Sequence, residues 1–374
     1  MAAEYQIELR DFTTGTRLAW LSGSTGSGRG FLRLTVSKRI NAPGLMVVEL
    51  PGDYPDLSHI LTDKTQVLLK RRDAARGIAW YTEFVGIARD PEYRSRGGVK
   101  TWTLTCPGLM SILSWYHVLW PANTTNRTVF TAAKAETVMK TLVNYNAVAT
   151  TATAANGRDR NAPNYGVSVQ ADAGNGTTID WTANRAKTLL SELQAIATVA
   201  GGDFDLAYVS PTSREFRFYA GQRGFDRTAT VTFAEHLGNM DNVRFRRVRS
   251  SERTAALVAG TGQEAARSTT IRTGANYSST NDIEVFVDAR NLNPDTASAR
   301  QARGDARLDE LEARDEFSFE VVQTEGLFYK GSYDLGDLIT AVKPDGVSVA
   351  QQIVGVDLEW TPDGEAISIE TRTR

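Results

Sequence analysis

The sequence predicts a mainly β protein with helical inserts, in which two barrel-like strand regions lie on either side of a helical segment. Apolar and polar residues alternate over most of the first hundred residues, and helical spacing first appears in the middle of the chain. Short alternating runs bounded by glycine and proline then return toward the C-terminus. Because 374 residues exceed one ordinary hydrophobic core, we expect several compact units.

The first hundred residues predict short antiparallel strands. Tyr5, Ile7 and Leu9 alternate with polar residues, and the apolar run 45–50 ends at a proline-glycine turn. The Gly97-Gly98 pair suits a tight hairpin, because glycine readily adopts positive φ. Further strands are expected at residues 31–36, 66–69, 81–87 and 101–105. Residues 1–108, joined by about 204–236, are expected to form the first barrel.

A helix-containing insert domain is expected over residues 109–203. Residues 129–145 carry apolar side chains at helical spacing, which predicts a first helix. The low-complexity stretch 147–166 has little apolar surface and predicts a mobile loop or linker. A second helix is expected to be capped by Asn184 or Thr182 and to end at Gly201-Gly202.

Strands return after this insert and predict a second barrel over residues 237–374. A hairpin is expected to turn at residues 210–213. Residues 295–314 mix charges closely and predict a solvated helix, broken or softened at Gly304. The remaining strands are expected at residues 204–209, 216–219, 230–233, 243–248, 256–259, 283–287, 317–321, 338–342, 353–358 and 367–369.

Composition excludes several classes of protein. A formal net charge of −2 provides no global attraction to nucleic acid or acidic membranes. No stretch offers the roughly 20 consecutive apolar residues of a membrane span, and the N-terminus MAAEYQIELRDF lacks the features of a secretory signal. We therefore expect a soluble protein that is made and assembled in the cytoplasm.

The sequence predicts neither a metal site nor thiol chemistry. Cys106 is the single cysteine and lies in the alternating run TWTLTCPGL, so a buried inert thiol is expected. His59, His117 and His236 are scattered, and no cysteine-histidine spacing suits zinc.

The glycine-rich segment 23–30, GSTGSGRG, resembles a phosphate-binding loop only superficially. Such a loop requires lysine and then serine or threonine after the second glycine, followed by a helix. Here Arg29-Gly30 leads into the strand-like run FLRLTVSKRI. A flexible hairpin tip is therefore expected.

Four arginines, Arg244, Arg246, Arg247 and Arg249, occupy one predicted strand. In a regular strand Arg244 and Arg246 share one face, while the adjacent Arg246-Arg247 pair indicates a bulge or strand end. The simpler interpretation is a solvated face or a salt-bridged strip between subunits. The alternative is a positive ring that lines a channel for DNA.

No catalytic, cofactor-binding or metal-binding residue is predicted. The sequence has no nucleophile elbow, no metalloprotease motif, and no credible pairing of a nucleophile with a base and an orienting acid. Acid pairs such as Asp203 and Asp205, or Asp309, Glu310 and Glu312, are expected to face solvent. Among 44 acidic residues such pairs give little support for a glycosidase.

Two segments are similar to the siphophage tail-hub or baseplate-hub family, typified by a hub-like protein of a Rhodococcus siphophage. They are GFDRTATVTFAEHLGNM at residues 224–240 and IEVFVDARN at residues 283–291. The order of features over roughly residues 5–340 is also similar: a strand domain ending in CPGLMSILSW, then the helices AETVMKTLVNYN and AKTLLSELQAIA. The segment YDLGDLI at residues 333–339 resembles a turn and strand of such hubs.

The resemblance implies a structural, non-enzymatic tail-tip hub with two tail-tube-like β-barrel domains and smaller α/β insert domains. It implies a homotrimer whose six barrels continue the hexameric tail tube, as a pseudo-sixfold ring of three chains requires. The implied location is the virion tail tip, after assembly in the host cytoplasm. The implied partners are the distal tail ring protein, the tape-measure protein and tail fibre or spike proteins, with DNA passing through the lumen.

The resemblance also implies structural signature residues, among which we expect Asp226 and Arg227 to make local hydrogen bonds or a salt bridge. The set is Phe225, Asp226, Arg227, Thr228, Gly238, Asn239, Val287, Asp288, Ala289 and Arg290.

Two other functions stay open from the sequence. A carbohydrate-binding adhesin module is favoured if Trp115, Tyr116 and Trp120 form a shallow surface groove. A cell-wall hydrolase requires a concave site with convergent titratable groups. A trimer with a central opening supports the hub, a glycan-binding monomer supports the adhesin, and clearing of purified cell walls supports the hydrolase.

Overall fold

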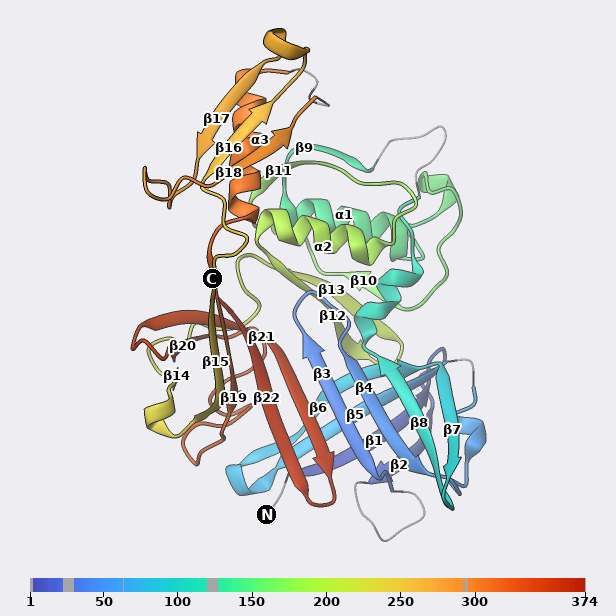
Figure 1. The fold of residues 1–374 in the computed structure, drawn as a ribbon. Helices are drawn as coiled ribbons and strands as arrows, with labels where there is room; N and C mark the ends of the chain where they lie inside the picture. Colours follow the sequence, from blue (N-terminus) through green and yellow to red (C-terminus); the bar gives the residue numbers. More distant parts are fainter. Residues whose placement is uncertain are drawn as a thin grey trace. The chain divides into compact units, whose positions relative to one another are not determined.

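The computed structural model describes residues 3–22, 30–62, 64–119, 127–290, 292 and 295–373 (Figure 1). The chain divides into two compact units: unit 1 is Met1–Asn242 with Phe319–Arg374, and unit 2 is Val243–Ser318. Most of the predicted glycine-rich hairpin tip, residues 23–29, and Trp120 lie outside the described residues.

One sheet of unit 1 has four antiparallel strands in the order β2-β1-β5-β6. The predicted alternation is confirmed, because Ile7 and Leu9 are fully buried, as is Val67, the partner of Leu9 across the strand pair. The strands are β1 (Glu4–Asp11), β2 (Arg17–Ser22), β5 (Thr65–Asp73) and β6 (Ile78–Ala88).

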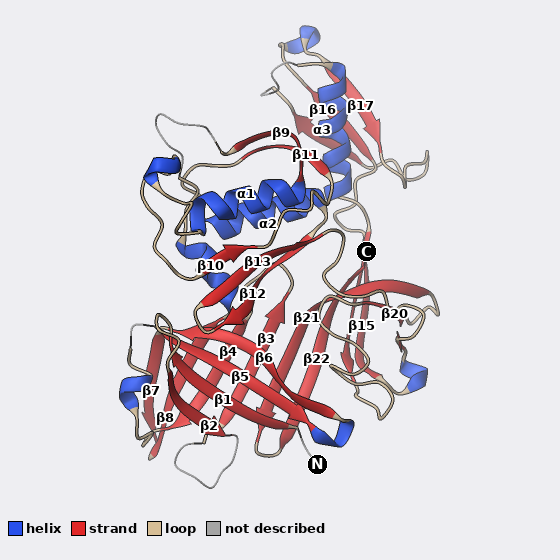
Figure 2. Ribbon diagram, turned by 180° about the vertical axis from the view of Figure 1, so that it is seen from behind, coloured by secondary structure: helices blue, strands red, loops and turns tan. Residues whose placement is uncertain are grey.

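A larger sheet of unit 1 joins strands from both ends of the chain. It runs in the order β14-β20-β21-β3-β4-β8-β7, and β22 also pairs with β21 (Figure 2). The pairing of β21 with β3 therefore puts residues of the first and last predicted regions into one sheet. The strands are β3 (Arg33–Arg39), β4 (Leu45–Pro51), β7 (Asp90–Arg96), β8 (Val99–Pro107), β14 (Thr232–Phe233), β20 (Leu338–Val342), β21 (Ser348–Thr361) and β22 (Gly364–Thr373).

The central segment of unit 1 packs helices α1 (Ala135–Ala147) and α2 (Leu189–Ala200) beside a three-stranded sheet (Figure 1). The first helix begins later than predicted, because Val129–Lys134 is strand β9 and pairs with β11. That pairing depends on a segment far along the chain. The strands are β9 (Val129–Lys134), β10 (Val167–Val169), β11 (Thr178–Thr182), β12 (Asp203–Ser210) and β13 (Ser213–Tyr219).

Two details of this segment differ from the predictions. Helix α2 is capped by Thr188, whose hydroxyl accepts a hydrogen bond from the Ser191 amide, rather than by Asn184 or Thr182. The stretch 147–166 is anchored to the core, because Ala152 and Ala162 are buried and joined by a 2.8 Å backbone hydrogen bond. Small apolar side chains are sufficient here because a larger core surrounds them.

Unit 2 packs helix α3 on a three-stranded sheet in the order β17-β16-β18. The predicted charged helix is confirmed, but it is continuous through Gly304. A Cβ at Gly304 would lie 2.8 Å from both Arg272 Cγ and Val258 Cγ2, so the missing side chain lets the helix approach the sheet. The elements are β16 (Ala255–Ala259), β17 (Thr269–Thr273), β18 (Glu284–Asp288) and α3 (Ala297–Glu310).

The chain leaves unit 1 along β15 (Met240–Val248) and returns along β19 (Arg314–Val321), and these two strands pair. Short 3₁₀ helices complete the secondary structure: η1 (Leu57–His59), η2 (Ala74–Arg76), η3 (Leu109–Trp115), η4 (Ala154–Asn156), η5 (Glu235–Leu237) and η6 (Glu264–Ala266). The mainly β class with helical inserts is confirmed. Within the described residues the strands form several open sheets, and none of these sheets closes on itself.

Candidate functional site

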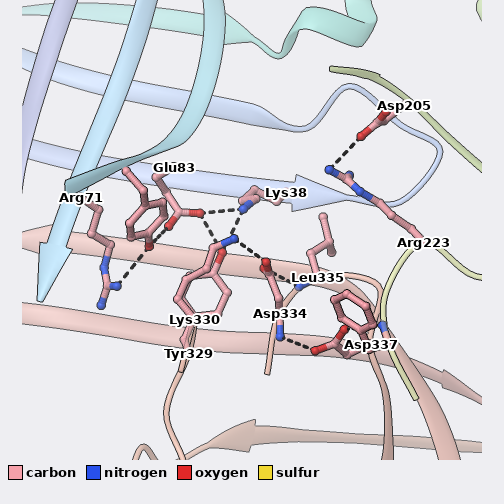
Figure 3. Close-up of polar contacts among 12 residues, drawn as sticks. Lys38, Arg71, Glu83, Asp205, Arg223, Tyr329, Lys330, Asp334, Leu335 and Asp337 are labelled. Atoms are coloured by element: carbon pink, nitrogen blue, oxygen red, sulfur yellow. Dashed lines mark hydrogen bonds and ion pairs between the residues drawn. The ribbon is translucent and has the colours of Figure 1, made fainter. Parts of the chain in front are cut away.

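Unit 1 contains a buried polar cluster that joins residues from both ends of the chain (Figure 3). Lys38 on β3 donates hydrogen bonds to Glu83 Oε1 at 2.7 Å and to the Tyr329 hydroxyl at 2.9 Å. The Tyr329 hydroxyl in turn donates to Glu83 Oε1 at 2.7 Å. Lys38, Glu83 and Tyr329 are therefore mutually hydrogen bonded, with Glu83 and Tyr329 buried and Lys38 partly buried.

The cluster continues from Glu83 to a fully buried arginine. Tyr81 donates a 2.5 Å hydrogen bond to Glu83 Oε2, and Arg71 Nη1 donates to the Tyr81 hydroxyl at 3.2 Å. Arg71 Nη2 also donates to both carboxylate oxygens of Glu365, at 2.8 and 3.1 Å, and Arg71 Nε donates to the Tyr5 hydroxyl at 3.0 Å. The network thereby connects β1, β5 and β6 to the C-terminal strand β22.

The charges in this cluster stabilise one another. Burial favours the neutral form of Glu83, but the ammonium groups of Lys38 and Lys330 and the hydrogen bonds to the carboxylate outweigh it and lower the pKa of Glu83 to about 2. Burial lowers the pKa of Lys38, and Glu83 opposes that shift. Burial also raises the pKa of the Tyr329 phenol well above its ordinary value. The site therefore holds an ion pair and a neutral phenol.

The segment that follows Tyr329 contributes a second set of buried contacts. Asp337, which is 1% exposed, accepts hydrogen bonds from Arg227 Nε at 2.7 Å, the Phe225 amide at 2.8 Å and the Asp334 amide at 2.9 Å. Lys330 pairs with Asp334 at 2.5 Å. Asp337 therefore joins the segment containing the predicted signature to the loop that precedes β20.

The acidic pair Asp203 and Asp205 is buried, contrary to the expectation of solvent-facing carboxylates. Asp203 accepts hydrogen bonds from Gln352 Nε2 at 2.7 Å and the Arg223 amide at 2.9 Å. Asp205 pairs with Arg223 at 2.8 Å (Figure 3), and burial raises the pKa of Asp205 against that attraction. The first four residues of β12 are all buried, so both faces of the strand are covered at this end and both carboxylates are buried.

Two small cavities border these groups. One of about 340 Å³ is lined by Lys38, Glu83, Asp205 and Arg223, and one of about 230 Å³ is lined by Arg227, Asp337 and neighbouring residues. Each cation here has an acidic partner within 3 Å, so the arrangement holds strands together and offers no unpaired charge to a substrate.

The first predicted signature segment lies beside this cluster. Asp226 accepts hydrogen bonds from the Thr228 amide at 3.0 Å and hydroxyl at 2.7 Å, while Arg227 pairs with Asp337. Phe225 is 73% exposed. Their role as a family signature stays a prediction.

Two other signature residues, Gly238 and Asn239, form a local turn. The Asn239 side chain accepts from the Ala234 amide at 2.9 Å and donates to the Thr232 carbonyl at 2.8 Å. Gly238 has φ of +65°, which glycine adopts without strain, and it ends the short helix η5.

The third signature segment lies in unit 2. Val287 and Ala289 are buried against helix α3 and its neighbours, whereas Asp288 is exposed and pairs with Arg290 at 2.6 Å and Arg267 at 2.9 Å. Alternate residues of this segment therefore have different surroundings: Val287 and Ala289 pack in the core, and Asp288 forms ion pairs at the surface.

The arginine strand, Arg244, Arg246, Arg247 and Arg249, is exposed on β15 and just after it. Arg247 pairs with Asp315 at 2.8 Å, and Arg246 lies 3.8 Å from Glu316. Within the described part of the chain, Arg244 and Arg249 have no acidic partner at ion-pair distance. An interface or lumen role for the strand stays a prediction.

The other candidate chemistries gain no support from the described residues. Cys106 is fully buried and burial raises the pKa of its thiol, and no group of histidine, cysteine, aspartate and glutamate among the described residues is arranged to hold a metal. Tyr116 is 1% exposed and donates to the Pro163 carbonyl, while Trp115 packs on Tyr165. Tyr116 therefore belongs to the core, and Trp115 is partly buried against it.

Sequence reasoning missed the buried cluster, although a signal for it exists. Lys38 occurs at the same strand parity as the buried residues Leu34 and Val36. Glu83 lies at an irregularity in the pairing of β6 with β5, so strand parity does not place its side chain. A charged residue at a core-facing strand position indicates a buried partner. The sequence does not identify the partners, because residues as far apart as Tyr329 and Glu83, which are separated by 246 positions, meet only in the folded chain.

Comparisons with known proteins identify both a family and a fold. A family model described as Siphovirus ReqiPepy6 Gp37-like protein matches residues 24–371. No curated protein sequence matches the chain. No described helix is long and apolar enough to cross a membrane.

Several solved structures share the fold over nearly the whole of this chain. The 43 kDa tail protein of prophage MuSo2 from Shewanella oneidensis has a TM-score of 0.60 at 10% identity, over 99% of this chain and 98% of that one. Prophage tail protein gp18 from Listeria monocytogenes has a TM-score of 0.54 at 12% identity, over 99% and 95% of the two chains. A chain of the Francisella PdpA-VgrG complex has a TM-score of 0.57 at 9% identity, over 99% of this chain and 58% of that one. At such identities the likeness is one of fold.

Proposed function

Since the chain belongs to the Siphovirus ReqiPepy6 Gp37-like protein family, we propose that it is a structural hub at the tip of a siphophage tail. The observation that carries this proposal is the combination of a family match over residues 24–371 with an end-to-end fold shared with prophage tail proteins. The fold shared with a chain of a PdpA-VgrG complex adds support.

In this proposal three copies form a ring that continues the tail tube. Two strand-rich regions separated by a helical insert would supply six tube-like domains from three chains. Their expected extents are residues 1–108 with about 204–236, and residues 237–374, with the insert at 109–203. The open sheets support assembly, because β2 and β7 are edge strands within the described part of unit 1 and edge strands readily pair with another chain.

The buried cluster has a structural role in this proposal. A ring subunit must resist force while the tail is assembled and used, and the contacts of Lys38, Glu83 and Tyr329 join the N-terminal and C-terminal strands of unit 1. The paired charges support a structural rather than an enzymatic role.

The proposed partners are those of a tail-tip hub. They are the distal tail ring protein, the tape-measure protein and fibre or spike proteins, with DNA passing through the lumen of the ring. The proposed location is the tail tip of the virion, reached after assembly in the host cytoplasm.

The proposal is tested by the mass and shape of the purified protein. We expect three times the monomer mass in native mass spectrometry, and a ring with a central opening in electron micrographs. A species that stays monomeric both alone and with the distal tail ring protein, and that binds cell-wall glycans, would contradict the hub and favour an adhesin.

A further inference from the structure

The sheet of unit 2 has one face covered by helix α3 and one open face. Val258, Val287 and Leu308 belong to the small core under the helix, and Arg272 pairs with Asp305 of α3 at 2.6 Å. These residues define the covered face. Since successive strand residues point to opposite sides, their neighbours in the sequence point away from the helix.

The open face carries a row of large apolar side chains across all three strands. Leu257 on β16 is directly paired with Ile271 on β17 and with Phe286 on β18. Ile271 is 69% exposed, Phe286 is 57% exposed and Leu257 is 39% exposed. The solvated face of a sheet is normally polar, so a continuous apolar row indicates a surface that another molecule covers.

The charges beside this apolar row select the kind of partner. Glu284 and Asp288 lie at open-face positions of β18 on either side of Phe286. Asp288 pairs with Arg267 and Arg290, whereas Glu284 has no basic partner at ion-pair distance within the described residues. The matching partner is therefore a surface of exposed arginines, because guanidinium groups suit Glu284 and the aliphatic stems of arginine can pack on the apolar row.

The arginine strand of the same unit has that composition. Arg244 and Arg246 share one face of β15, opposite to Phe245, both arginines are exposed, and Arg244 has no acidic partner in the described part of the chain. Arginine also suits interfaces, because its guanidinium group is planar and weakly hydrated. Two complementary surfaces that are both open in one copy fit a contact between copies.

We propose that the open face of unit 2, centred on Ile271, Leu257 and Phe286, binds the arginine strand of a second copy of the chain. Each copy then gives its arginine strand to one neighbour and receives the other neighbour's strand on its sheet. Such a head-to-tail contact uses two different surfaces and closes into a ring when the rotation permits. This inference rests on the proposed hub, since it assigns a contact within the proposed ring.

Charge reversal provides the first test. Glu284→Arg and Arg244→Glu should each weaken self-association at least about tenfold, because each places like charges together at a partly desolvated contact. The double variant restores the opposite pairing and should return to within about threefold of the unchanged chain. Self-association is measured by analytical ultracentrifugation over a range of concentrations.

The apolar row is tested with a matched control. Ile271→Ser should weaken self-association about tenfold or more, whereas Val199→Ser, at a 64% exposed position on α2, should leave it unchanged. Both positions are exposed, so both variants should keep the unfolding midpoint of the unchanged chain.

Crosslinking in assembled phage tails tests the contact where the proposal puts it. A chain with both Arg244→Cys and Glu284→Cys, the two residues proposed to meet, should give linked dimers and trimers with a short bismaleimide, and either single variant should give neither. The native Cys106 is buried and should not react while the chain is folded. This measurement does not depend on whether the isolated chain assembles.

The outcomes separate this inference from the proposed hub. A trimeric ring without charge coupling and without crosslinks would overturn the contact and leave the hub standing. Absence of any ring would overturn both. Crosslinking of the open face to a different tail protein would show that the occupant is not a second copy, and would also overturn the inference.

Discussion

Tyr329 donates a 2.7 Å hydrogen bond to Glu83 across a separation of 246 residues. The two residues belong to the two ends of the chain, and Lys38 contacts both of them. A buried ion pair is costly unless its remaining hydrogen bonds are satisfied, and here Tyr329 and Tyr81 satisfy those of the carboxylate. We therefore expect the stability of unit 1 to fall when a single polar atom of this cluster is removed.

Removing one hydroxyl tests that sensitivity. Tyr329→Phe deletes a donor to Glu83 and an acceptor for Lys38 in a buried site, so we expect unfolding free energy to fall by about 1–3 kcal/mol. Tyr93→Phe, at a 44% exposed position, is the control and should change it by less than about 0.5 kcal/mol. Urea titration measures both; equal effects in the two variants would refute the assignment.

Acid should destabilise the cluster in a defined window. Because the pKa of Glu83 is lowered to about 2 in the folded chain from an ordinary value of 4.5, its stabilising contribution is complete above pH 4.5. That contribution is lost as the pH falls from 4.5 through 2. In Glu83→Gln the unfolding midpoint should depend less on pH in this range than in the unchanged chain. Equal pH dependence in both would contradict the ion pair.

Asp337 should be the most sensitive residue of the signature region. Asp337→Ala leaves Arg227 and two backbone amides without their acceptor in a buried site, so we expect a loss of about 3 kcal/mol or more. Asp226→Ala removes an exposed acceptor of the Thr228 amide and hydroxyl and should cost much less. Thermal unfolding that ranks the two variants in the reverse order would count against this structure.

Gly304 distinguishes helix propensity from packing. In an exposed helix Gly→Ala stabilises by about 1 kcal/mol. At Gly304 the added Cβ would lie 2.8 Å from Val258 Cγ2, so Gly304→Ala should instead destabilise unit 2 by about 1–3 kcal/mol. The exposed position Ala302 provides the control, where Ala302→Gly should cost about 1 kcal/mol. Stabilisation by Gly304→Ala would mean that α3 does not contact the sheet closely.

Local patterns predicted much of the fold. The alternation at Ile7 and Leu9, the hairpin turn at residues 210–213 and the charged helix α3 each follow from the spacing of nearby residues. The prediction of a helix over residues 129–134 is wrong. These residues form a strand because they pair with β11, a distant segment that local spacing does not reveal. Tertiary pairing can override local propensity in this way.

The candidate site was less accessible from the sequence. In the sequence, Asp203 and Asp205 cannot be distinguished from surface acids. Their partners, Gln352 and Arg223, become neighbours only in the folded chain. The open face of unit 2 was missed because β17, which carries Ile271, was not predicted as a strand. The direct pairing of Leu257 with Phe286 also joins two strands that local patterns do not show to be neighbours.

The most direct test of the central claim is a reconstruction of the tail tip of the phage that encodes this chain. We predict three copies of the chain in one ring at the end of the tail tube, with strand-rich regions of each copy around a central channel. A tail tip without this chain, or with single copies outside the axis of the tube, would contradict the hub.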